Sequence, residues 1–139
     1  MVTAVCTKDT PVGYELDGVK KQAAIQLMGS RHWGRVNPIH FDPVTAANHG
    51  LKAPIQTGQM SSAYLFEMCV NFFGENMFRN AHMHGKYVKP VYAGETITTH
   101  GIVSEKTPEG SGYRFKVELW ADNQDGEVKT VSWVTAHVE

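Results

Sequence analysis

The stretch Thr57–Gly74, TGQMSSAYLFEMCVNFFG, decides the fold. It has no glycine or proline between Gln59 and Phe73, so nothing interrupts a helix there. Its apolar residues fall on more than one side of such a helix, which predicts that protein surrounds most of it. The pair Thr57-Gly58 predicts the start of the helix, and Gly74 predicts its end. A long, largely buried helix is therefore the expected centre of the molecule.

The last third of the chain predicts an antiparallel β-sheet. Four runs either alternate in polarity or are rich in β-branched residues, and they span residues 81–91, 95–106, 112–123 and 127–138. Turn-forming residues separate these runs, and Asp125-Gly126 between two alternating runs is a strong hairpin signal. One helix cannot cover both faces of so long a sheet, so we expect some of its apolar surface to contact a second subunit.

The first half of the chain is less regular. Residues 20–28 predict a helical run, and residues 29–40 predict an ordered but irregular loop, because glycine and proline break any periodicity. Asp42-Pro43 predicts the start of a short helix, since aspartate accepts backbone N–H groups and proline suits the first helical position. The expected class is α+β, in one domain over residues 1–139.

Composition limits the possible partners. The chain has 139 residues, 42% of them hydrophobic and 19% charged, as in a compact globular domain. Its net charge of −1 provides no basic field for nucleic acid or for an anionic membrane surface. Cys6 and Cys69 have no paired spacing, and the chain begins with no secretion signal. These features predict a cytoplasmic protein with no nucleic-acid or membrane partner.

Four blocks carry a family resemblance, and they occur in order as NPIHFDP, APIQTGQM, KYVKPVYAGETIT and VELWADNQDGEV. Together they resemble the MaoC-like dehydratases, the family of the R-specific enoyl-CoA hydratases. The resemblance implies a hot-dog fold, in which an antiparallel sheet wraps around one long central helix. It also implies a dimer that joins two sheets, either a homodimer or a heteromer with a related hot-dog subunit.

The activity that the resemblance implies is hydration or dehydration, the reversible addition of water to a 2-enoyl thioester. The substrate would be an acyl-CoA or an acyl-carrier thioester bound in a tunnel at the subunit interface. No cofactor and no metal are implied. The acyl chain, the physiological direction and the carrier are left open.

Three candidate catalytic residues follow from the first block. The family histidine falls on His40, and imidazole suits acid–base work near neutral pH. Asn37 lies beside it and either orients the loop or binds water. The family aspartate lies five residues before the histidine, where this chain has Arg35. Guanidinium stays protonated, so Arg35 cannot replace aspartate as a base.

By resemblance, the second block forms the binding site for the thioester oxygen, at the start of the long helix. By resemblance the Gly58 N–H would bind that oxygen, with the neighbouring Thr57 standing where relatives often carry histidine. Glycine would let the ligand approach closely, and the helix dipole favours the negative charge that develops on the oxygen. The plainer alternatives are that Gly58 only begins the helix and that His40 only ties a loop to the backbone.

Arg35 leaves several hypotheses open. It can pair with a substrate carboxylate or a CoA phosphate, or it can be a solvated loop residue. The chain can also be the non-catalytic subunit of a heteromeric hydratase, or a protein that only binds acyl thioesters. A further alternative is an acyl-CoA thioesterase that uses Glu67 in the long helix, although a solvent-facing or interface-paired Glu67 is favoured.

Other side chains have weaker claims. His82 and His84 share one face of a strand, where they suit a sheet surface better than a metal site. Lys86, Lys89 and Arg114 are possible contacts for CoA phosphates or ordinary surface residues. The remaining aromatic residues are expected in the core or an interface, namely Phe66, Phe72, Phe73 and Trp120.

Overall fold

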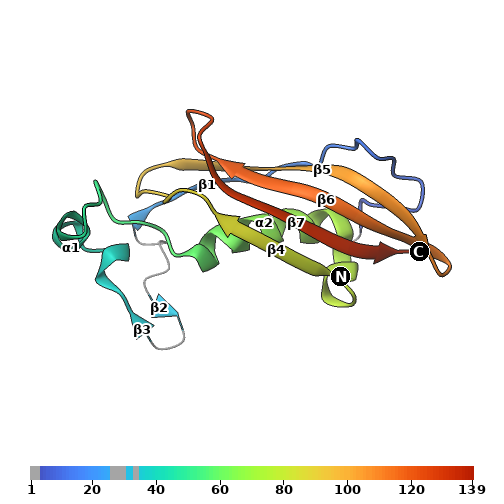
Figure 1. Cartoon of the computed structure of the whole chain (residues 1–139), viewed down its shortest axis with the longest axis horizontal. Helices are drawn as coiled ribbons and strands as arrows, with labels where there is room; N and C mark the ends of the chain where they lie inside the picture. The colour runs from blue at the N-terminus through green and yellow to red at the C-terminus, as the bar shows by residue number, and fades with distance from the viewer. Residues whose placement is uncertain (1–3, 26–30, 33–34) are drawn as a thin grey trace.

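A curved sheet and one long helix make up the body of the protein. The computed structural model describes residues 4–25, 31–32 and 35–139. Figure 1 shows the sheet lying over the helix α2, with a small arm of short elements extending beyond one end of the sheet. The C-terminus lies toward the opposite end (Figure 1).

The main sheet has five antiparallel strands in the order β1-β5-β6-β7-β4. They are β1 (Lys20–Gln22), β4 (His82–Tyr87), β5 (Thr96–Glu109), β6 (Gly112–Asp122) and β7 (Val128–Val138). Side chains along β5, β6 and β7 alternate between buried and half-exposed, so one face of the sheet forms the core. The four predicted β runs are confirmed as β4 to β7.

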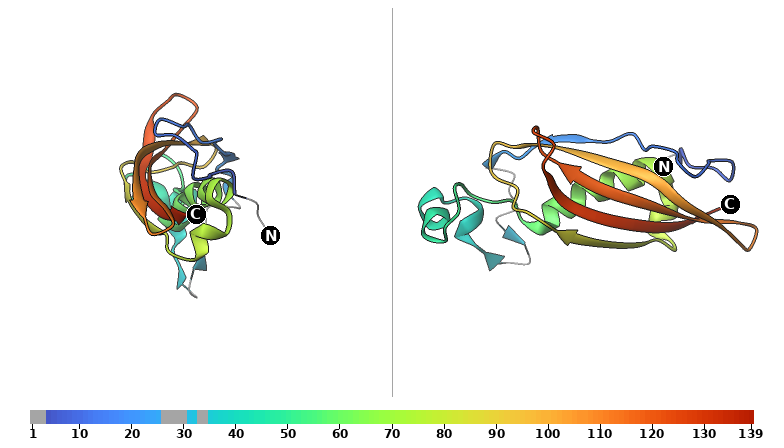
Figure 2. Two further views of the ribbon diagram at one scale, coloured as in Figure 1. Left: turned by 90° about the vertical axis from the view of Figure 1, so that its right-hand side faces the viewer. Right: turned by 45° about the horizontal axis from the view of Figure 1, so that its top comes forward.

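Helix α2 spans Gly58–Phe73 and fills the concave face of that sheet. Thr57 caps its start, and Gly74 ends it with a φ of 60°, a conformation that glycine adopts without strain. Its buried side joins the core at Leu65, Met68 and neighbouring positions. The predicted helix is confirmed, and the sheet curled around it in Figure 2 is the hot-dog fold of the α+β class.

A short arm precedes α2. It contains β2 (Arg31–His32) and β3 (Arg35–Val36), which pair with each other, then the 3₁₀ helix η2 (Pro38–His40) and the helix α1 (Pro43–Asn48). The predicted helix start at Asp42-Pro43 is confirmed, because the Asp42 carboxylate accepts the N–H of Val44 at 3.0 Å. Two-residue strands replace part of the expected irregular loop.

One expectation about another segment is wrong. Lys20–Gln22, predicted as part of a helix, forms β1 because it pairs with Thr96–Thr98 of β5, and residues 26–30 lie outside the described chain.

The aromatic residues divide between the core and the surface. Phe72 and Phe73 are in the core as expected. Trp120 is half-buried on the outer face of the sheet, where its ring stacks on His100 with centroids 5.2 Å apart, and Phe66 is exposed. For these two residues the expectation of an interface stays a prediction.

No helix in the described residues is long and apolar enough to cross a membrane.

A buried ion cluster fixes the turn between β4 and β5 to the β6–β7 hairpin. The Lys129 ammonium, 2% exposed, lies 3.2 Å from Glu95 Oε1 and 2.7 Å from Glu127 Oε1. The Glu95 carboxylate also accepts the N–H of Tyr92 and the amide of Asn123. Burial works against the charge of Glu95, but these hydrogen bonds and Lys129 outweigh it and lower the pKa of that carboxyl.

Removing the ammonium tests this cluster. We expect Lys129→Met to lower the free energy of unfolding at neutral pH by about 3 kcal/mol, because it leaves Glu95 buried without its cation. The matched control is Lys89→Met, which removes an exposed partner of Glu127 and should cost less than about 1 kcal/mol. Urea unfolding measures both.

The pH dependence of that loss has a defined sign. Glu95 has a lowered pKa in the folded protein, so its contribution to stability is present above its ordinary value of 4.5 and is lost as the pH falls below it. The difference between wild type and Lys129→Met should therefore shrink in acid. Equal losses for both lysine variants at neutral pH would show that the cluster is not a stabilising element.

Candidate active site

The short segment Pro54–Thr57 connects the arm to the body of the protein. The N–H of Ile55 donates to the carbonyl of Ile39 in η2 at 3.1 Å. On its other side, Gln56 N–H donates to the carbonyl of Val91 at 2.8 Å, just after β4. The segment thus has the arm on one side and the sheet on the other, and it leads directly into α2.

The predicted histidine, His40, is hydrogen-bonded to this segment. The ring Nδ1 of His40 lies 2.7 Å from the carbonyl oxygen of Ile55. A carbonyl only accepts, so Nδ1 carries the proton and the neutral ring has its lone pair on Nε2. Ile55 is three residues before Gly58, so the hydrogen bond ties His40 to the segment that leads into α2. The half-buried imidazole is thereby oriented as a proton acceptor through Nε2.

The start of α2 provides a backbone donor. Thr57 is buried, and its Oγ1 accepts the N–H of Met60 at 3.3 Å, as an N-cap residue should. The N–H of Gly58 has no acceptor in the part of the chain that the structure describes. Free N–H groups and the helix dipole make this end favourable for negative charge.

Gln56 is a residue that the sequence reasoning missed. Its side-chain amide donates to Ser61 Oγ at 2.9 Å, and its Oε1 accepts the Tyr64 hydroxyl at 2.9 Å. All three side chains are buried, so this network fixes the first turn of α2 to the segment before it. The signal that could have revealed it is the pair Ser61 and Tyr64, two hydroxyl residues three positions apart on one side of the helix that follows Gln56.

The ring of Tyr87 occupies the space beside Gly58 that a side chain at this position would fill. A Cβ added at Gly58 would lie 2.6 Å from Cε2 of Tyr87, at the end of β4. The Tyr87 hydroxyl shares a hydrogen bond of 2.6 Å with Ser62 Oγ, one turn further along α2. Tyr87 therefore occupies the space on the Cβ side of Gly58, and the approach of a ligand to the Gly58 N–H stays a prediction.

The other two predicted catalytic residues are in the arm. Asn37 is exposed, and its Oδ1 accepts the N–H of Ile39 at 3.3 Å, so it caps η2. Arg35 pairs through its backbone with His32, and its side chain lies outside the described residues. The structure thus ties His40 to the segment before α2 and gives Asn37 a structural contact.

The weaker candidates have ordinary surface contacts. Glu67 lies 2.8 Å from the Lys21 ammonium on the outer side of α2, as a surface-paired glutamate would. The His84 ring packs against Trp133 across the outer face of the sheet. Arg114 binds Glu109 at 2.9 Å, far along the sheet from α1 and η2.

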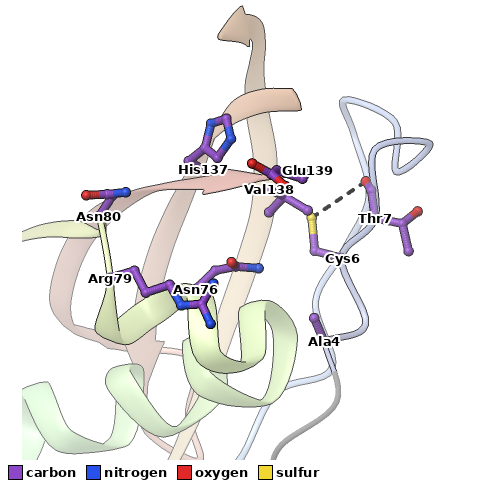
Figure 3. A pocket seen from close by; sticks show the side chains of 9 residues that line it. All are labelled: Ala4, Cys6, Thr7, Asn76, Arg79, Asn80, His137, Val138 and Glu139. Atoms are coloured by element: carbon purple, nitrogen blue, oxygen red, sulfur yellow. Dashed lines mark hydrogen bonds between the residues drawn. The ribbon is translucent and has the colours of Figure 1, made fainter. Parts of the chain in front are cut away.

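A wide pocket of about 530 Å³, shown in Figure 3, includes the C-terminal residues, which lie at the end of the sheet opposite the arm (Figure 1). Two of its polar side chains have partners, since His137 contacts Glu109 at 2.7 Å and Arg79 contacts Glu75 at 3.2 Å. Burial raises the pKa of its thiol, Cys6, to about 11, so the thiol stays protonated at neutral pH. The pocket contains none of the predicted site residues.

Comparisons with known proteins agree with this architecture. The MaoC like domain family matches residues 32–122, and the chain belongs to that family. No curated protein sequence matches the chain.

Solved structures share the fold at low sequence identity. The R-hydratase PhaJ1 from Pseudomonas aeruginosa is 20% identical over 94% of this chain and 83% of its own, with a TM-score of 0.79. The (R)-hydratase from A. caviae involved in PHA biosynthesis is 15% identical over 94% and 98%, with a TM-score of 0.75. A chain of the ChsH1-ChsH2 complex from Mycobacterium tuberculosis is 18% identical over 94% and 99%, also at 0.75.

The contact between Gly58 and Tyr87 gives a prediction about stability. Alanine normally stabilises a helix relative to glycine by about 1 kcal/mol. We expect Gly58→Ala to lose this gain or to destabilise the protein by up to about 1 kcal/mol, because the new methyl group overlaps the Tyr87 ring, which must turn away and give up its hydrogen bond to Ser62. In a Tyr87→Ala background the same change should be neutral or stabilising. Thermal or urea unfolding of the four proteins in this cycle measures the coupling.

An effect of Gly58→Ala that is the same with and without the Tyr87 ring would contradict the close contact.

Proposed function

We propose that this chain is a hydratase or dehydratase of 2-enoyl thioesters, with His40 as the residue that moves the proton. The observation that supports the proposal most strongly is the 2.7 Å hydrogen bond from His40 Nδ1 to the carbonyl of Ile55. It leaves Nε2 as the basic atom and ties the ring to the segment that leads into α2. Family membership supplies the reaction class.

Hydration begins when water adds to C3 of the enoyl thioester. In the proposed reaction Nε2 of His40 accepts a proton from that water as its oxygen forms a bond to C3. The electron pair of the C2–C3 double bond moves toward the thioester carbonyl and produces an enolate. C2 then takes a proton, from the imidazolium or from a water that it contacts, and dehydration follows the same steps in reverse.

The enolate oxygen needs a donor, and the Gly58 N–H at the start of α2 is the proposed one. A backbone donor of this kind is commonly worth about 3–4 kcal/mol in the transition state. Thr57 contributes by capping the helix, which keeps the first turn and its N–H groups in place. No cofactor is required for this chemistry, and none is proposed.

A histidine substitution tests the proposal. We expect His40→Gln to lower kcat for enoyl-CoA hydration by ~100- to 10,000-fold, because glutamine has no basic atom to accept the proton. The matched control is His49→Gln. The ring of His49 in the same arm also contacts a backbone carbonyl, that of Thr45 at 2.9 Å, but it is exposed and not tied to the segment before α2.

Loss of the conjugated absorbance of the enoyl thioester measures the rate in both variants. An unchanged rate in His40→Gln would exclude His40 as the base.

Arg35 favours a second candidate function, that of a partner subunit in a heteromeric hydratase. The position that holds the family aspartate carries a fixed positive charge here, and one structurally similar chain comes from the ChsH1-ChsH2 complex. In this case the companion chain would carry the complete pair of catalytic residues. A homodimer that is active alone, seen by native mass measurement, excludes this candidate.

Restoring the acidic residue separates the two candidates further. If Arg35 only replaces the carboxylate in an otherwise unchanged pocket, Arg35→Asp should raise the rate of hydration of simple enoyl-CoAs. The physical reason is that a carboxylate stabilises the imidazolium that forms during the reaction. No gain in rate would indicate a pocket adapted to another substrate or a chain that depends on its partner. Arg31→Asp, in the neighbouring strand, is the control for charge alone.

A further inference from the structure

We propose that a hollow beside His100, on the outer face of the sheet, binds a planar heteroaromatic ring with an anionic tail, of the mononucleotide class. The hollow has a volume of about 280 Å³ and lies at the β1 edge of the sheet. Its lining includes Glu15, Gly18, Lys20, Thr98, His100 and Trp120. Helix α2 lies against the opposite, concave face, so this site is separate from the thioester site proposed above (Figure 2).

Two aromatic rings form a stack that ends at the hollow. His100 of β5 and Trp120 of β6 are direct neighbours across the sheet, and their ring planes differ by 14°. Because β6 lies on one side of β5 and β1 on the other, Trp120 covers the β6 side of the imidazole. The other side of the imidazole faces the edge of the sheet, where the hollow is. A flat ring in the hollow therefore continues the stack as its third member.

Asp122 holds the His100 ring in this orientation. The imidazole Nε2 lies 2.9 Å from Oδ1 of Asp122, and an ionised carboxylate only accepts, so Nε2 carries a proton. A side chain that is fixed in advance loses little freedom when a ligand stacks on it. The ring is thus already positioned as a binding surface.

The hollow exists because the edge of the sheet has no side chain that covers His100. The edge segment is hydrogen-bonded to β5 at Leu16 and again at Val19. Two residues, Asp17 and Gly18, therefore lie opposite His100 alone, which is a β-bulge. A Cβ added at Gly18 would clash with a backbone oxygen of β5, so only glycine fits. Asp17 lines a different hollow, beside α2.

Opposite charges flank the hollow. Glu15 pairs with Ile102 and Lys20 pairs with Thr98, and both β5 residues are at outer-face positions. The four steps from Thr98 to Ile102 along β5 span about 13 Å. Both charged side chains belong to exposed residues, and neither has an ion-pair partner in the part of the chain that the structure describes. Both charges are therefore available to a ligand.

The size of the hollow and these two charges indicate the ligand class. Pockets for drug-sized ligands occupy about 300–1,000 Å³, so a hollow of about 280 Å³ suits one ring system with a short tail. The Lys20 ammonium binds a phosphate, and the Glu15 carboxylate accepts hydrogen bonds from an amino group on the ring. AMP and CMP carry an amino group, a stacking ring and a phosphate in this order.

One other carboxylate has to be considered beside the phosphate. Asp122 and Lys20 both neighbour Thr98, from opposite sides, so they are two strands or roughly 10 Å apart. The Asp122 carboxylate is also hydrogen-bonded to His100. Its charge is therefore directed at the imidazole rather than at the position of the phosphate.

Calorimetric titration of AMP into the full chain tests the proposal. AMP should bind wild type, and His100→Ala should raise its Kd by about tenfold or more, because the base loses the ring on which it stacks. Lys20→Met should raise the Kd by about threefold or more, through loss of the ion pair. The matched control is Lys21→Met, which should leave the Kd unchanged because Lys21 binds Glu67 of α2 at 2.8 Å.

Two further comparisons assign the roles of the ring and of Glu15. His100→Phe keeps a ring for the stack without the hydrogen bond to Asp122, so it should bind AMP more tightly than His100→Ala. IMP has a carbonyl where AMP has its amino group, so wild type should bind IMP more weakly. In Glu15→Gln this difference should disappear, because an amide can also donate to the carbonyl.

The proposal is overturned if AMP does not bind, or if His100→Ala and Lys20→Met, shown to be folded by thermal unfolding, bind it as wild type does. If His100→Ala does not fold, Lys20→Met and the AMP–IMP comparison decide in the same way. Displacement of AMP by a saturated acyl-CoA would also overturn it, because the nucleotide would then occupy the thioester site. AMP binding that persists in saturating acyl-CoA and depends on both side chains supports a separate site.

Discussion

The structure depends on the hydrogen bonds of one short segment, Pro54–Thr57. Ile55 binds η2 through its N–H and orients His40 through its carbonyl, while Gln56 binds the β4–β5 connection through its N–H and the first turn of α2 through its amide. An extended segment has few ways to satisfy its polar groups, and here these four groups bind different neighbours. The arm, the sheet and the central helix therefore have fixed positions relative to one another.

This constraint explains how a histidine and a helix terminus from different parts of the chain meet. The arm has little packing of its own, and its exposed Val44 and Phe41 show that it does not build a second core. The ring of His40 is positioned by a carbonyl rather than by a carboxylate, which is consistent with a chain that has Arg35 at the family aspartate position. An aspartate at this position could both orient the imidazole and stabilise its positive charge. In this chain the Ile55 carbonyl orients the ring, and position 35 has no carboxylate to stabilise the charge.

Local patterns were sufficient for most of the fold. Gln59–Phe73 lacks helix breakers, and Asp125-Gly126 joins two alternating runs, so α2 and the β6–β7 hairpin were predictable. β1 was not, because its three residues become a strand only by pairing with β5, more than 70 positions away. The proposal of His40 as a site residue came from the family blocks, whereas its hydrogen bond to Ile55 and the contact of Tyr87 with Gly58 are tertiary and leave no local signal.

The most direct test is nitrogen-15 NMR of the His40 ring and the Gly58 amide, before and after addition of a saturated acyl-CoA. The account predicts a neutral ring with the proton on Nδ1 and a bare Nε2, and a change at both Nε2 and the Gly58 amide when the thioester binds. A ring protonated on Nε2, or binding that leaves both nitrogens unchanged, would contradict the proposed site.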